Sequence, residues 1–200
     1  MKKLCVYAIL VMGLLGGAVW AQIPVNMQQA DSTADGKPYL REHLALPTEI
    51  RQMLNENKAK EAVAEYEKFK KTTQADALDM FLLDTEVYGS ASFIEPGSNY
   101  GKMREEAVRK MLEKYPKNAE ALMYTMPEDG NFNKSLDVLN KMIEVDPDYL
   151  PAYEYRLDLY NQKMMTKEAC MDYMKLPESV QKRKYMSVDC KALMEDTENK

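Results

Sequence analysis

The side chains that most often carry enzyme chemistry are scarce in this chain of 200 residues, which has one histidine, three cysteines and one tryptophan. Serine or cysteine nucleophiles need a positioned base, and zinc sites need several Cys or His ligands at close spacing. The single histidine, His43, has no evident orienting partner and is interpreted as a lone surface residue. The eight glycines are scattered and form no phosphate-binding loop. We therefore expect a protein that is not an enzyme and needs no cofactor.

Basic residues are fewer than acidic ones, with 27 Lys and Arg against 32 Asp and Glu and a formal net charge of −5. Binding to nucleic acid requires a basic surface that neutralises phosphates. The balance therefore argues against nucleic acid, and against an anionic membrane, as the partner. Carboxylate pairs such as Glu105/Glu106 or Asp84/Glu86 could serve an enzyme site, but they are indistinguishable from a solvated helix face.

A long uncharged run occurs at the N-terminus, where Leu4–Trp20 follows the basic start Met1–Lys3. This pattern is typical of a secretory signal peptide, with cleavage expected after Ala21. The alternative is an uncleaved membrane anchor, because the run approaches the roughly 20 residues that span a bilayer. We expect residues 1–21 to be the signal and the protein to be exported, periplasmic or secreted in a bacterium. No transmembrane segment would remain after cleavage.

The next residues, 22–44, are polar with little apolar content and are predicted to form a flexible linker. A helical domain is predicted over 45–195, followed by a disordered tail over 196–200. Two cysteines, Cys170 and Cys190, lie in the domain. In an oxidising compartment they are predicted to form a disulfide, which would stabilise the fold by about 3 kcal/mol on the chain-entropy model. The alternative is two buried thiols that pack as small apolar residues.

Apolar residues recur at helical spacing from about position 47 onward. One stripe is formed by Ala59, Ala62, Val63, Tyr66 and Phe69, and similar stripes run through 103–115, 136–143 and 150–164. No segment sustains the alternation typical of a strand. Proline and glycine interrupt the pattern near positions 97, 116, 130, 147 and 177, with a loop of about ten residues expected over 92–101. These features predict an all-α fold of short antiparallel helices.

A repeat of 34 residues relates Ser135 to Ala169, each near the start of a helix. Around them, large and small residues follow the pattern of the tetratricopeptide repeat, at Ser135, Pro147, Tyr153, Leu157, Tyr160, Ala169 and Tyr173. The chain resembles that family over about 133–177 and more loosely over 47–116. Leu157 departs from the usual small residue, so a wider helix spacing is expected there. The helix around 119–125 is too short for a standard unit.

The resemblance implies helix pairs stacked as a short right-handed solenoid, closed by a C-terminal capping helix at about Ser187–Met194. It also implies a groove lined by the first helix of each pair, which places four residues there: Glu154, Asp158, Asn161 and Gln162. This face is polar to acidic, so a partner with basic or amide-rich segments is expected. The leading hypothesis is therefore an adaptor or scaffold that binds a peptide or protein.

Methionine is abundant, with 16 residues, and Met164, Met165, Met171 and Met174 cluster within the best repeat. Core filling is the expected role, because most of these positions lie on or beside the apolar stripes. An adaptable peptide-binding surface is an alternative. A metal-handling protein is another, because Met171 and Met174 offer thioethers of the kind that copper(I) favours.

A calcium site was also considered at Asp129–Asn133, where oxygen-bearing side chains alternate. Lys134 stands where a calcium loop needs glycine, and Asn140 stands where it needs a bidentate glutamate. We therefore interpret the segment as a turn that caps the next helix.

Overall fold

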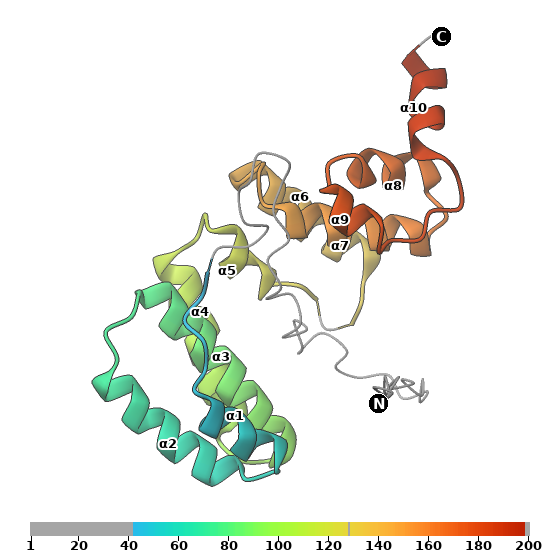
Figure 1. The fold of residues 1–200 in the computed structure, drawn as a ribbon. Coiled ribbons are helices and arrows are strands. Elements are labelled where there is room, and N and C mark those ends of the chain that lie inside the picture. The colour runs from blue at the N-terminus through green and yellow to red at the C-terminus, as the bar shows by residue number, and fades with distance from the viewer. Residues whose placement is uncertain (1–41, 128, 199–200) are drawn as a thin grey trace, which may run out of the picture.

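The computed structural model describes residues 42–127 and 129–198. The predicted signal peptide and residues 22–41 of the predicted linker lie outside the described residues. Within them the chain forms ten α-helices and no strand (Figure 1), which confirms the all-α prediction. The helices are α1 (Thr48–Asn55), α2 (Ala59–Thr72), α3 (Ala77–Ile94), α4 (Tyr100–Lys114), α5 (Ala119–Met123), α6 (Phe132–Val145), α7 (Leu150–Gln162), α8 (Thr166–Tyr173), α9 (Glu178–Gln181) and α10 (Cys190–Glu198).

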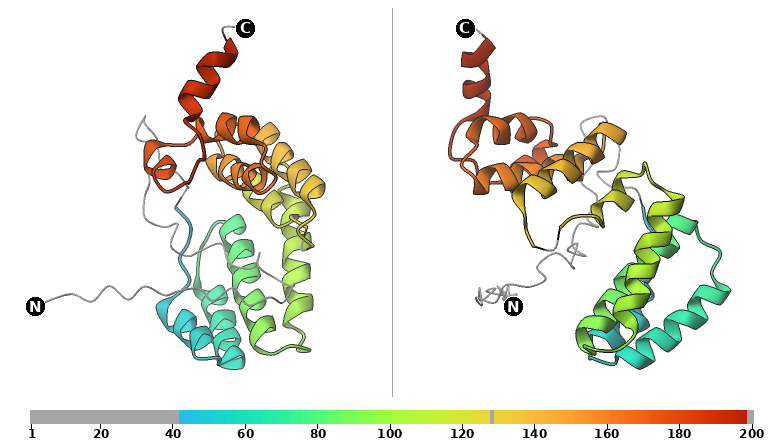
Figure 2. Two further views of the ribbon diagram at one scale, coloured as in Figure 1. Left: turned by 90° about the vertical axis from the view of Figure 1, so that its right-hand side faces the viewer. Right: turned by 180° about the vertical axis from the view of Figure 1, so that it is seen from behind.

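Helices that are neighbours in the sequence pack against each other from α1 through to α8. The helices α1 to α4, in blue to green, form one end of the molecule, and α6 to α9 form the other (Figure 1). The last helix, α10, contacts α8 and then projects away from the body in each view (Figure 2). Among the described helices none combines the length and apolar character needed to cross a bilayer.

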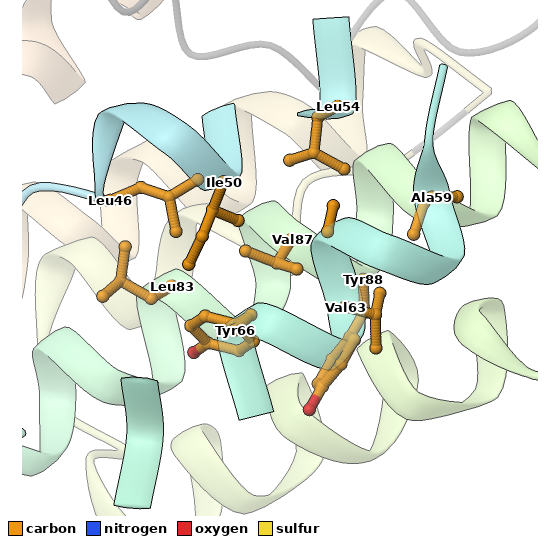
Figure 3. Close-up of a cluster of buried hydrophobic side chains, with 11 residues drawn as sticks. Leu46, Ile50, Leu54, Ala59, Val63, Tyr66, Leu83, Val87 and Tyr88 are labelled. Carbon is orange, nitrogen blue, oxygen red and sulfur yellow. The ribbon is translucent and has the colours of Figure 1, made fainter. Parts of the chain in front are cut away.

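The first core lies among α1, α2 and α3 (Figure 3). Ile50, Tyr66 and Val87 contribute one large side chain from each helix, and all three are almost fully buried. Ala59 and Ala62 are equally buried, so α2 approaches its neighbours along the predicted apolar stripe. Burial of each large side chain stabilises the fold by about 1.5–3 kcal/mol, which explains why these short helices hold together.

The predicted repeat residues lie in and around the cores of the second half. Ser135, Leu157 and Ala169 are fully buried, and Tyr153 is nearly so. The Tyr153 hydroxyl donates a hydrogen bond to the Pro147 carbonyl at 3.1 Å, which fastens the start of α7 to the turn before it. Tyr160 and Tyr173 are half-buried, whereas Pro147 is exposed in that turn.

Several predicted boundaries differ from the observed ones. The helix α3 continues to Ile94, because it contains no proline and the first proline after it is Pro96, and the loop before α4 is therefore 95–99. The capping helix begins at Cys190 rather than Ser187, because the Asp189 carboxylate accepts hydrogen bonds from two amides of the first turn, at 3.0 and 3.2 Å. It also extends into the segment that was predicted to be a disordered tail. The short α5 agrees with expectation.

Candidate functional site

The acidic side of α7 is covered by the chain that follows α9. Residues 182–189, named here the covering segment, place the Lys184 ammonium 2.9 Å from a carboxylate oxygen of Glu154 and 2.7 Å from one of Asp158. The side chains of Lys184 and Glu154 are only 18% and 9% exposed. The prediction that Glu154 lines an open groove is therefore wrong, because Lys184 of the same chain pairs with its carboxylate and buries it.

The covering segment follows α7 toward its C-terminal end. The Asn161 side-chain amide donates to the Met186 sulfur at 3.7 Å, while Gln162 is exposed. Burial by itself lowers the pKa of Lys184, but the hydrogen bonds that its ammonium donates to the Asp158 and Glu154 carboxylates outweigh burial, so the pKa is raised. Glu154 is thus buried by the covering segment, Asp158 and Asn161 contact it but stay partly or largely exposed, and Gln162 is exposed.

A second ion pair ties α6, α7 and α8 together. Arg156 on α7 binds Asp172 on α8 through two parallel hydrogen bonds of 2.8 and 2.7 Å, and donates a third to Asn140 on α6 at 2.6 Å. Its guanidinium lies 5.6 Å and 5.9 Å from the ring centres of Tyr153 and Tyr160. The hydrogen bonds that Arg156 donates to Asp172 raise the pKa of Arg156. Such a bidentate, largely buried pair fixes helix orientation more firmly than a surface contact does.

The predicted disulfide is present. The sulfurs of Cys170 on α8 and Cys190 at the start of α10 are bonded at 2.09 Å, and both residues are buried. The bridge joins α10 to α8 and closes the end of the covering segment. Both ends of that segment are therefore held, by Val180 buried in the core on one side and by the disulfide on the other.

The expectation that the clustered methionines fill the core is wrong for three of them. Met164, Met171 and Met174 are 90%, 52% and 46% exposed. Met164 falls in a left-handed turn after α7 has ended at Gln162, so it leaves the apolar stripe of that helix. The other two lie on the side of α8 opposite Ala169, because positions two and five residues further along point away from it.

The exposed side of α8 forms a defined surface. The methionine face, as it is named here, consists of Lys167 and Met171 on α8 and of Met174 and Lys175 in the turn that follows it, and all four residues are exposed. A hollow of about 300 Å³ adjoins it, lined by Tyr173, Met174, Gln181, Met186, Val188, Asp189, Cys190 and Lys191. The sequence predicted an adaptable methionine surface only as an alternative to core filling, although the two lysines that bracket Met171 were a signal of exposure.

His43 is not the lone surface residue that the sequence suggested. Its two ring nitrogens lie 3.3 Å from an Asp79 oxygen and 2.9 Å from a Glu120 oxygen. Asp79 also accepts the Leu44 amide at 3.4 Å. Both ring nitrogens can donate only when the imidazole is protonated. These contacts of His43 therefore connect the segment before α1 to α3 and α5.

Asp84, one of the carboxylates considered for an enzyme site, is engaged in a structural network. It accepts the Tyr66 hydroxyl at 2.9 Å and the Lys70 ammonium at 2.6 Å. Burial raises the pKa of Tyr66 far above its usual range. Tyr88 donates its hydroxyl to Glu67 in the same network. The arrangement satisfies buried polar groups between α2 and α3.

No protein-family model matches this chain, and no curated protein matches it either. Among the described residues, no group of three or more His, Cys, Asp and Glu side chains is arranged to hold a metal ion. At the calcium candidate, Asp129 accepts the Asn131 amide at 3.0 Å and Asn131 in turn accepts the Lys134 amide at 3.1 Å, which caps α6. The methionine face and the closed acidic side of α7 remain the two surfaces with a distinct chemistry.

Proposed function

We propose that this protein is an exported, non-catalytic adaptor, built from tetratricopeptide-like helix pairs, that binds a protein or peptide partner. Support for the architecture comes from the sequential packing of α1 to α8 and from the burial of Ser135 and Ala169 at corresponding repeat positions. Such stacks expose a continuous surface made by successive helices. Their usual role is to present that surface to a partner, and this is the role we assign.

The observation that carries the proposal is the concentration of apolar surface at one end of the molecule. Of the six large hydrophobic side chains that are exposed among the described residues, five lie between positions 164 and 188: Met164, Met171, Met174, Tyr185 and Val188. Soluble proteins seldom leave such side chains together on the surface unless a partner covers them. Thioethers also adapt to varied shapes, which suits a binding surface.

This end of the molecule is rigid before any partner arrives. The disulfide joins α10 to α8, the Arg156–Asp172 pair joins α8 to α7, and Lys184 fixes the covering segment on α7. A surface that is already ordered loses less conformational entropy on binding. The proposal therefore places partner binding on the methionine face, and not on the acidic side of α7, which the covering segment occupies.

Site-specific photo-crosslinking tests this function. A benzophenone amino acid replaces Met171 in one variant and Lys60, an exposed residue of α2, in the control. After irradiation of whole cells, we expect one discrete adduct at position 171, identified by mass spectrometry, and none at position 60. Adducts at position 60 alone, or none at either position, would refute the proposal.

A metal-handling role is the second candidate, because the structure exposes both thioethers that it requires. Met171 and Met174 lie about one helical turn apart in solvent, and Met186 lines the same hollow as Met174. Titration with copper(I) under ascorbate, against a competing chelator, separates the two functions. Tight stoichiometric binding that is lost in the Met171→Leu/Met174→Leu variant would establish the metal role. The adaptor proposal expects no such binding.

A further inference from the structure

The surface around the methionine face has the opposite charge to the rest of the protein. Residues 163–191 contain seven Lys and Arg but four Asp and Glu, although the whole chain has a net charge of −5. Two of the four acids are already paired, Asp172 with Arg156 and Glu178 with Lys182. A third, Asp189, caps α10. Among the cations, Lys182 is paired with Glu178, and Lys184 is paired with Glu154 and Asp158 of α7. In the described part of the chain, the positive charge on either side of Met171 and Met174 is therefore that of Lys167 and Lys175.

Two of these cations bracket the exposed thioethers. Lys167 and Met171 lie on α8, and Lys175 lies in the turn that follows it, so Met171 is midway between the two lysines in the sequence. Within the part of the chain that the structure describes, neither lysine has an ion-pair partner. Along α8 and the turn after it, the methionine face therefore presents a lysine, two thioethers and a second lysine.

An amphipathic helix of a partner could pack on the methionine face. Apolar residues at i, i+3 and i+4 of an incoming helix would cover Met171 and Met174. Carboxylates on either side of those apolar residues could pair with the two lysines. We propose that the methionine face binds an α-helical segment of a partner protein that presents apolar side chains flanked by Asp or Glu. This inference rests on the adaptor function proposed above.

Two synthetic 14-residue peptides test the inference on the full exported chain with its disulfide intact. Both carry leucine at i, i+3, i+4 and i+7, and the flanking positions are Glu in one peptide and Lys in the other. Fluorescence anisotropy should show the Glu peptide binding about tenfold more tightly at low salt, because two exposed ion pairs are gained and two like-charge contacts are avoided. Added salt should reduce that difference.

Variants of the protein test whether the methionine face causes the difference in affinity between the two peptides. Lys167→Glu/Lys175→Glu should reverse the order of the two peptides, and Met171→Glu should weaken both. A charge-matched control, Lys60→Glu/Lys102→Glu, changes exposed lysines on α2 and α4 and should leave the order unchanged. Circular dichroism confirms that each variant keeps its helical content.

Other outcomes would overturn the inference. Equal affinity for the two peptides, or no binding of the Glu peptide at 1 mM, removes the acidic helix as the occupant. Concentration-dependent dimerisation in sedimentation velocity, abolished by Met171→Glu, shows that a second copy of the chain covers the face instead. If position 171 crosslinks a partner in cells while the lysine reversal changes nothing, the adaptor function stands and this inference is wrong.

Discussion

The ion pair between Arg156 and Asp172 offers the sharpest test of how the C-terminal end is held. The change is Asp172→Asn, which keeps the shape of the side chain and removes its charge. Asp172 is almost fully buried and accepts two hydrogen bonds from the guanidinium. Removing one partner of a buried pair costs 3–5 kcal/mol, because the other charge stays buried without compensation.

The contacts that Arg156 keeps place the cost of Asp172→Asn at the lower end of that range. Arg156 keeps its hydrogen bond to Asn140 and its contacts with two tyrosine rings, and part of it reaches solvent. We therefore expect Asp172→Asn to lower the free energy of unfolding by about 3 kcal/mol. The double variant Arg156→Met/Asp172→Leu removes both charges together with their desolvation cost, so it should lose about 1 kcal/mol or less.

Urea denaturation followed by circular dichroism measures both values. With a slope of about 2 kcal/mol per molar urea, the single variant should shift the midpoint by about 1.5 M. Tyrosine fluorescence should give the same midpoint, which checks that unfolding is two-state. If the single variant loses less than about 1 kcal/mol, or if the double variant loses more than the single one, the pair does not organise these helices as argued.

Three further outcomes follow from the same structure. Replacing Cys170 and Cys190 with serine should reduce the free energy of unfolding by about 3 kcal/mol, measured by urea denaturation of both proteins without reductant. Lys184→Met should cost about 2 kcal/mol, because Glu154 stays buried without its cation, and adding Glu154→Gln should recover part of the loss. His43→Gln should destabilise the protein, because the glutamine amide cannot contact the carboxylates of Asp79 and Glu120 from two ring nitrogens, as thermal unfolding would show.

The Lys184 effect also has a defined pH dependence. The pKa of Lys184 is raised in the folded state, so its stabilising contribution is complete below about pH 10, the usual range for lysine, and is lost as the pH rises above it. The stability difference between the parent chain and Lys184→Met should therefore be constant from pH 6 to 9. A difference that already falls between pH 6 and 9 would show that another group, and not this ammonium, is responsible.

For His43 the facing groups are the carboxylates of Asp79 and Glu120. Tyr124 and Tyr149 lie near Glu120, but burial raises the pKa of each, so they stay neutral between pH 5 and 8. An unchanged midpoint of thermal unfolding in His43→Gln would contradict the double contact. Asp79→Asn serves as the matched control, because it removes one of the two acceptors.

The sequence predicted burial correctly where the position of a residue on its own helix determines whether it is buried. The stripe that includes Ala62 and Tyr66 is buried as predicted, because helical periodicity places these residues on one side whatever the neighbours are. The disulfide was also predictable, because compartment and cysteine number left few alternatives. The covering segment was not, because Lys184 and Asp158 are 26 residues apart and nothing in either local pattern indicates the other.

The sequence by itself determined that the chain is helical, roughly where its helices begin and end, and which two cysteines meet. Local rules of periodicity, proline and capping are enough for these features, because each depends on residues within a few turns. The tertiary structure alone decided which polar and apolar groups are left for a partner. The Glu154 carboxylate is buried beneath a lysine from a distant segment, and Met171 is exposed because α8 buries Ala169 and Cys170 instead. Such outcomes depend on which helix faces meet, and that is a property of the whole packing arrangement.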